Sequence, residues 1–171
     1  MVTLSIIILS YNTKDLTLRC INSVIKQYRK EFDSGVFDII VVDNNSNDGS
    51  ILAISKFKDK ISNIKLIENK ENLGFAKGCN IGAKVSHGQY LLFLNSDTVA
   101  LDKGFVKMID FLEKNSKVAI LGGRLLNPDG TPQRSGGKFY SLWNLFLMLL
   151  GLDILLRKSA TKIEKIDWVS G

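Results

Sequence analysis

The sequence predicts an α/β fold in which a mostly parallel sheet carries helices on both faces. Three observations support this prediction. Apolar runs of strand length alternate with longer segments of helical periodicity from the N-terminus to Leu121. The runs are apolar nearly throughout, which is typical of parallel strands that are buried on both faces. Polar side chains directly follow three of the runs, at the carboxyl edge of the sheet where such folds bind ligands.

Five short apolar runs are expected to form strands. They are Leu4–Ser10, Phe37–Val42, Ile64–Glu68, Tyr90–Leu94 and Val118–Leu121. Their shortness and their content of Ile, Val, Leu and Phe favour strands over buried helices. Because helical segments separate them, we expect right-handed crossovers between parallel strands.

Four segments between and beside these strands are expected to form helices. Asn12 or Thr13 can cap the first, whose apolar face runs from Leu16 to Tyr28. The others are Ser50–Phe57, the small-residue segment Gly74–Val85, and a segment with Phe105, Met108, Ile109 and Leu112 on one face. Beyond Gly122 the pattern changes, and Asn127–Gly130 has the composition of a turn.

Composition and charge bound the class of protein. The chain has 171 residues, 45% hydrophobic and 23% charged, which is enough for one domain with a sizeable core. The net charge is +6, but the basic residues are scattered, so a solvated cationic surface is favoured and no nucleic-acid partner is expected. Cys20 and Cys79 are expected to be buried thiols in a reducing, cytoplasmic compartment. The apolar N-terminus has no basic region or cleavage pattern, so we interpret it as a strand and not as a signal peptide.

Three polar clusters follow the first, second and fourth strands. They are Ser10–Asn12, Asp43–Ser50 and Asn95–Asp97. Each cluster alone is ordinary turn material, because Asn, Asp and Ser side chains bond to nearby backbone. In a doubly wound sheet all three gather along one edge, and that convergence favours a ligand site.

A nucleoside diphosphate is a ligand whose chemistry these side chains suit. Carboxylates and amides can read the edge of a base, and oxygen ligands can hold the Mg²⁺ or Mn²⁺ that screens the phosphates. The chain has no Walker-type loop, and Gly74–Gly78 matches a dinucleotide fingerprint only loosely. A P-loop enzyme and a dehydrogenase are therefore both disfavoured.

Four ordered segments resemble a known family. SIIILSYNT, DIIVVDNNSNDGS, ENLGFAKGCNIGAKVSHGQYLLFLNSDT and GGRLLNPDGTPQRSGG closely resemble the inverting glycosyltransferases of family 2, and above all their rhamnosyltransferase-like branch. The resemblance covers nearly the whole chain. It implies a GT-A (Rossmann-like) fold and a nucleoside-diphosphate sugar donor, such as dTDP-rhamnose or a UDP-sugar. It also implies a cell-surface polysaccharide or a lipid-linked glycan as the acceptor.

The resemblance also implies roles for individual residues. Those assigned to the nucleotide-sugar are Ser10, Tyr11, Asp43, Asn44, Asn72, Gly74, Lys77, Asn80, Asn95 and Ser96. Ser10 and Tyr11 would line the base pocket, and either Asp43 or Asn44 would bind the base. Relatives often carry a basic residue where Gly78 stands, so the phosphate contact is expected either to be missing or to be supplied by Lys77.

Asn95–Asp97 stands in place of the DXD metal motif of the family. Asp97 would be the ligand of Mg²⁺ or Mn²⁺, and Asn95 would contact the ribose. One carboxylate instead of two implies weaker metal affinity, because ligand charge sets affinity in oxygen sites.

No catalytic residue is expected within the chain. In similar proteins Trp168–Gly171 leads into the acceptor half, where an Asp or Glu deprotonates the acceptor hydroxyl. We therefore expect the base beyond Gly171, and a fold that is incomplete at its C-terminus. A nucleotide-sugar-binding module without transfer activity stays open as an alternative. A sugar-phosphate nucleotidyltransferase is disfavoured, because its Gly-rich, basic N-terminal signature is absent.

Residues 1–135 are expected to form the donor-binding domain, and residues 136–171 an apolar helix and the start of a strand of the acceptor half. From Leu142 to Leu156 the chain is apolar at all but three positions, and the run is too short to span a bilayer comfortably. Two interpretations stay open. The segment can contact the inner face of the plasma membrane, beside Arg157 and Lys158, or it can be buried against protein, including another copy of the chain.

Overall fold

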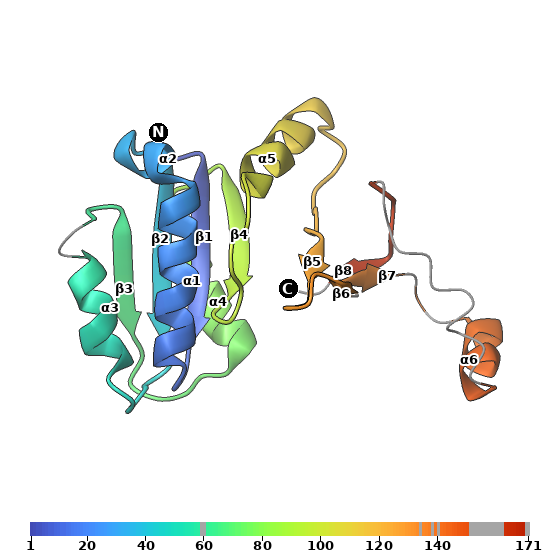
Figure 1. Cartoon of the computed structure of the whole chain (residues 1–171), viewed down its shortest axis with the longest axis horizontal. Helices are drawn as coiled ribbons and strands as arrows, with labels where there is room; N and C mark the ends of the chain where they lie inside the picture. Colours follow the sequence, from blue (N-terminus) through green and yellow to red (C-terminus); the bar gives the residue numbers. More distant parts are fainter. Residues whose placement is uncertain (59–60, 134, 138, 140, 151–162, 170–171) are drawn as a thin grey trace. The chain divides into compact units, whose positions relative to one another are not determined.

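Four of the five apolar runs form one parallel sheet, in the order β3-β2-β1-β4 (Figure 1). The strands are β1 (Leu4–Ser10), β2 (Phe37–Asp43), β3 (Ile64–Glu68) and β4 (Tyr90–Asn95). In the central strand β1, Leu4 lies opposite both Phe37 of β2 and Tyr90 of β4. The predicted parallel sheet is confirmed.

The computed structural model describes residues 1–58, 61–133, 135–137, 139, 141–150 and 163–169. The chain divides into two compact units, Met1–Asp110 and Phe111–Gly171. The first unit contains the sheet. The predicted boundary between residues 135 and 136 concerns function and stays a prediction.

Five helices accompany the sheet, and they cover both of its faces as predicted (Figure 1). They are α1 (Lys14–Gln27), α2 (Arg29–Asp33), α3 (Ser50–Lys58), α4 (Phe75–Lys84) and α5 (Gly104–Lys114). On one face Ile6 and Ile8 of β1 join a buried cluster with Ile21 of α1 and Ile54 of α3. On the other face α4 packs against β1 and β2. β1 and β2 are thus buried on both faces, and this burial explains their apolar sequences.

The second unit contains two short antiparallel pairs of strands. β5 (Leu125–Leu126) pairs with β6 (Pro132–Gln133), and β7 (Gly136–Gly137) pairs with β8 (Trp168–Val169). The predicted turn at Asn127–Gly130 joins the first pair: the amide of Gly130 donates to the carbonyl of Asn127, and Gly130 has a φ of 82°. A positive φ favours glycine at this place.

The predicted strand Val118–Leu121 is wrong. The segment pairs with none of the described residues, and Ile120 is 76% exposed. The amide of Val118 donates instead to the carbonyl of Asn115, in the turn that ends α5. An apolar run of four residues does not become a strand without a neighbouring ladder for its backbone groups.

The apolar segment after Ser141 begins as the predicted helix. α6 (Leu142–Leu149) exposes Leu142 and Leu149 by 87% and 85%, and Trp143 stacks on Phe146 with their ring centroids 5.7 Å apart. Residues 151–162, which include the rest of the predicted segment, lie outside the described part of the chain. Within the described part, no helix is both long and apolar enough to cross a membrane.

Candidate functional site

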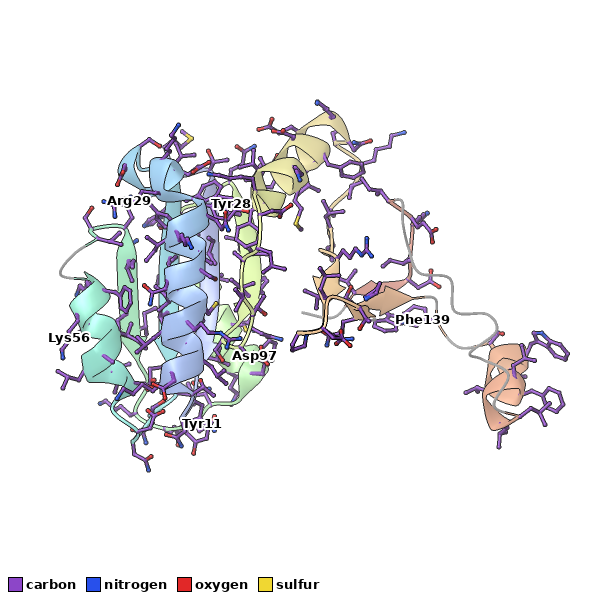
Figure 2. All side chains as sticks on the ribbon, viewed as in Figure 1. Tyr11, Tyr28, Arg29, Lys56, Asp97 and Phe139 are labelled. Atoms are coloured by element: carbon purple, nitrogen blue, oxygen red, sulfur yellow. The ribbon has the colours of Figure 1, made fainter. Side chains whose placement is uncertain are left out.

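The three polar clusters lie at one edge of the sheet, as predicted. Ser10 at the end of β1 lies opposite Asp43 at the end of β2, and Leu9 lies opposite Asn95 at the end of β4. Figure 2 shows Tyr11 and Asp97 at this end of the sheet. Parallel strands all end on the same side, so polar residues at the ends of strands meet although they are far apart in the sequence.

A group of hydroxyls joins the loop after β1 to the loop after β4. Thr17 Oγ1 lies 3.1 Å from both Ser10 Oγ and Thr13 Oγ1, and Thr13 Oγ1 lies 3.4 Å from Ser96 Oγ. Ser10 and Thr17 are fully buried, whereas Tyr11 is 46% exposed. Of the two residues predicted to line the base pocket, Tyr11 is thus exposed and Ser10 is buried within the loop, and a contact of either one with a base stays a prediction.

The loops after β1 and β2 are joined through Asn12. The backbone amide of Asn12 donates to Ser46 Oγ, and Asn12 Oδ1 accepts from the backbone amide of Asn47, each at 2.9 Å. Asn12 and Asn45 have φ values of 52° and 67°, a left-handed conformation that asparagine tolerates better than most residues. These asparagines make the tight turns that bring the two loops together.

The prediction that Asn12 or Thr13 caps α1 is wrong, and Asp48 takes this role. Thr13 occupies the capping position, but its side chain does not cap the helix, and the amide of Lys14 donates to Asp48 Oδ2 at 2.9 Å. Asp48 Oδ1 also accepts hydrogen bonds from the amide and the hydroxyl of Ser50, the first residue of α3. These bonds, above all the one from the Ser50 hydroxyl, hold the pKa of Asp48 below its usual value.

Asp43 and Asn44, the two candidates for the base contact, are both buried. Asp43 is 0% exposed, and its two oxygens accept from the amide and the hydroxyl of Ser46, each at 2.7 Å. Asn44 is 1% exposed. Both residues therefore shape the loops from within, and a direct contact of either one with the base stays a prediction.

Asn44 is the centre of an amide clamp, the group formed by Asn44, Asn69, Asn72 and Gly74. Its Nδ2 donates to Asn72 Oδ1 at 3.2 Å and to the carbonyl of Gly74 at 3.3 Å. Its Oδ1 accepts from Asn69 Nδ2 at 2.7 Å, and the amide of Gly74 donates to Asn72 Oδ1 at 2.9 Å. The clamp ties the end of β2 to the loop that precedes α4.

Glycines place α4 close to the sheet. Gly74, just before the helix, has φ 77° and ψ 173°, a region that is essentially restricted to glycine. A Cβ atom at Gly78 would overlap the side chain of Leu9 and lie 3.4 Å from Asn44 Oδ1. A side chain at this position would require Leu9 to move, whereas the predicted phosphate contact Lys77 and the predicted site residue Asn80 are exposed on α4.

Asp97 is the carboxylate of the cluster after β4, and it is exposed. Burial, together with the charge of Asp97, raises the pKa of the Cys20 thiol to about 12, so Cys20 is protonated at neutral pH. Among the described residues, no three His, Cys, Asp or Glu side chains are grouped to hold a metal ion. Asp97 fits an ion that takes its other ligands from phosphates and water, as Mg²⁺ does in many nucleotide sites.

Sequence reasoning missed the residues that organise the loops, above all Asp48 and Asn69. Asp48 stands two residues before a helix that begins with Ser50, a spacing typical of turns made by aspartate side chains. Asn69 directly follows β3, as the other polar clusters follow their strands. Its backbone amide donates to the backbone carbonyl of Asp43 at 2.8 Å. The same rule of polar residues at strand ends could have added it.

A parallel sheet with helices on both faces and polar loops gathered at its carboxyl edge defines a Rossmann-like domain. The chain belongs to glycosyl transferase family 2, whose sequence profile matches residues 5–165. This membership confirms the family that the sequence motifs indicated, whereas the rhamnosyltransferase-like branch stays a prediction.

Two relatives illustrate the similarity in sequence. The chain is 31% identical over 133 residues to a poly(ribitol-phosphate) beta-glucosyltransferase of Bacillus spizizenii, covering 76% of this chain and 20% of that protein. It is 30% identical over 121 residues to an uncharacterized glycosyltransferase of Haemophilus influenzae, covering 71% of this chain and 36% of that protein. The chain thus spans a fifth to just over a third of the length of these relatives.

Solved structures confirm the GT-A fold. TarS 1–349 of S. aureus in complex with UDP matches with a TM-score of 0.59 and 26% identity, over 67% of this chain and 33% of that chain. The mannosyltransferase PcManGT of Pyrobaculum calidifontis, in complex with GDP-Man and Mn²⁺, matches with a TM-score of 0.61 over 74% of this chain and 36% of that chain. At 18% identity, the second match shows the fold alone.

Proposed function

We propose that this chain is the donor-binding part of a metal-dependent, inverting glycosyltransferase that builds a polymer of the cell envelope. The observation that carries the proposal is the joining of the loops after all four strands, at one edge of the sheet, by Ser46, Thr13 and the amide clamp. Membership of glycosyl transferase family 2 supports the nucleoside-diphosphate sugar as the ligand. Relatives named for transfer to poly(ribitol-phosphate) support a cell-envelope acceptor.

In this proposal the nucleotide lies across the loops, with its base at Tyr11 and its diphosphate towards Asp97. Tyr11 exposes an aromatic ring on which a base can stack. Asp97 would hold Mg²⁺ or Mn²⁺, and the ion would supply the positive charge that offsets the charge of the diphosphate. The structure of TarS with UDP supports a uridine donor, and a thymidine donor remains the second candidate.

Two features of the whole enzyme stay proposals. The general base lies in a part of the protein beyond the donor-binding domain, so that a binding module without transfer is the alternative for this chain alone. The exposed apolar side of α6 supports peripheral contact with the inner face of the plasma membrane, where a lipid-linked acceptor would be found. A cytoplasmic location of the enzyme agrees with both the proposed membrane contact and the proposed lipid-linked acceptor.

Titration calorimetry with UDP, dTDP and GDP, with and without Mn²⁺ or Mg²⁺, tests the proposal. We expect binding that the metal strengthens, and Asp97→Ala should abolish the metal effect, because a methyl group cannot replace a carboxylate ligand. Asp33→Ala is the matched control, because Asp33 is an exposed carboxylate of α2, bonded to Arg29 at the opposite end of the sheet (Figure 2). If Asp97→Ala binds as the wild type does with metal present, Asp97 is not the ligand. If the wild type binds none of the nucleotides, the proposed function is wrong.

A further inference from the structure

We propose that Asn44 is a positioning residue, whose side-chain amide holds the loop Asn69–Gly74 and the start of α4 where the donor nucleotide requires them. The two donor hydrogens of the amide are essential, so a carboxylate of the same shape cannot replace it. The inference rests on the proposed function for the identity of the ligand. It gives Asn44 a supporting role in the site, in place of the predicted contact with the base.

Backbone groups fix the orientation of the amides in the clamp. The carbonyl of Gly74 can only accept a hydrogen bond, so the Asn44 atom that lies 3.3 Å from it must be the nitrogen. The amide of Gly74 can only donate, so the Asn72 atom that lies 2.9 Å from it must be the oxygen. The 3.2 Å contact between Asn44 and Asn72 is therefore a donor meeting an acceptor.

Burial separates Asn44 from any ligand. Its side chain is enclosed at 1% exposure, and its oxygen lies 3.4 Å from the place of a Cβ atom on Gly78. Both hydrogens of its amide are bonded within the clamp, and its oxygen accepts from Asn69. A base could reach Asn44 only if the clamp opened.

An aspartate at position 44 would reverse this chemistry. Its carboxylate would face two acceptors, Asn72 Oδ1 and the Gly74 carbonyl, with no hydrogen to donate to either. Such repulsion in a buried place favours the protonated acid, which can donate one of the two bonds and still accept from Asn69. The clamp of Asn44→Asp should therefore be open at high pH and should close as the pH falls.

Other titratable groups surround the clamp. They are Asp43 at the end of β2, Glu68 at the end of β3, Lys70 and Glu71 in the loop, and Lys77 and Cys79 on α4. Of these, Asp43 is buried with both oxygens bonded to Ser46, Cys79 is a buried thiol whose pKa burial raises, and the other four are exposed. All of them are also present in the wild type, so the ratio of variant to wild-type affinity at each pH isolates position 44.

Calorimetry with UDP and Mn²⁺ tests the pH dependence. The range is roughly pH 5.5 to 8, over which the buried carboxyl of Asn44→Asp is expected to change from protonated to ionised. We expect Asn44→Asp to bind about tenfold or more weakly than the wild type at the upper end, and to recover at the lower end. Asn45→Asp is the matched control: Asn45 is exposed, so this variant adds the same charge one residue away, and its ratio to the wild type should not recover. A pH-independent ratio for Asn44→Asp, or a changed preference among UDP, dTDP and GDP, would overturn the inference.

Hydrogen exchange tests the clamp without any nucleotide, and with variants at an exposed residue that should fold. Asn72→Asp keeps the oxygen that accepts from Asn44 and Gly74, so the backbone amides of Gly74 and Gly78, which are hydrogen-bonded, should stay as protected as in the wild type. Asn72→Ala removes that oxygen, and these amides should exchange faster while those of β1 stay protected. Equal protection in both variants would mean that the clamp does not hold the loop. If the wild type binds no nucleotide, the proposed function fails and hydrogen exchange still decides on the clamp.

Discussion

Replacing Tyr28 with phenylalanine should lower the free energy of unfolding by about 2–3 kcal/mol. Tyr28 is fully buried, and its hydroxyl donates to the carbonyl of Asp102 at 2.9 Å and accepts from the amide of Phe105 at 2.8 Å. Phenylalanine keeps the stacking on Phe105, with ring centroids 4.7 Å apart. The substitution therefore removes two hydrogen bonds and little packing. Each lost bond is worth about 1 kcal/mol, and the two backbone groups left without their partner account for the rest.

Urea unfolding followed by circular dichroism measures this loss, and Tyr90→Phe is the control. The hydroxyl of Tyr90 makes no hydrogen bond to the described residues, so its removal should change stability by less than about 0.5 kcal/mol. Nucleotide affinity should stay unchanged in Tyr28→Phe, because Tyr28 lies at the end of the sheet opposite Tyr11 (Figure 2). If Tyr28→Phe costs no more than Tyr90→Phe, the two bonds contribute nothing and the reasoning is refuted.

The pH dependence gives a second measurement on the same variant. Burial raises the pKa of Tyr28 to about 12, above the value of about 10 for an unfolded tyrosine. A raised pKa means that the stability from the neutral phenol is complete below pH 10, and that it is lost as the pH rises from there through 12. Tyr28→Phe lacks this loss, so the difference between the two proteins should shrink in that range.

Two further predictions concern Asp48 and α6. The pKa of Asp48 is lowered, first by the Ser50 hydroxyl, so its stabilising effect is present above the unfolded pKa of about 3.9 and is lost as the pH falls through the lower folded value. Asp48→Ala should therefore cost about 1 kcal/mol at pH 7 and less at roughly pH 2, as measured by unfolding at both pH values, and an equal cost at both would contradict a capping role of the ionised carboxylate. The exposed leucines of α6 should bind anionic vesicles, so the protein should float with them in a flotation assay. The double variant Leu142→Asp/Leu149→Asp should remain in the soluble fraction. If neither protein floats, the membrane interpretation fails and α6 belongs to a protein interface.

The strands of the sheet could be predicted because burial on two faces leaves a local signal. Ile6, Ile7 and Ile8 are all buried, whichever face each of them points to, and the resulting run is visible in the sequence. Val118–Leu121 has the same local signal but pairs with no strand in the described part of the chain, and no local pattern reveals whether a neighbouring strand exists. The same limit explains why the position of the site could be predicted whereas its internal bonds could not. The bond from Asn69 to Asn44 joins residues 25 positions apart, and the one between Thr13 and Ser96 joins residues 83 positions apart.

The glycines of α4 and the amide of Asn44 depend on each other. Gly82 lies so close to β1 and β2 that a Cβ atom would come within 2.6 Å of Ile7 Cγ2 and 3.2 Å of Val42 Cγ2. Only a helix packed at this distance brings the Gly74 carbonyl within reach of Asn44 Nδ2. A larger side chain at Gly82 would push α4 outward and lengthen that bond, since the buried Ile7 and Val42 have few rotamers with which to give way. At Gly78 the nearest atoms are the terminal methyl groups of Leu9. A basic residue in place of Gly78 therefore requires the Leu9 side chain or α4 to move, and because Asn44 Oδ1 lies 3.4 Å from the same place, positions 44 and 78 are expected to change together.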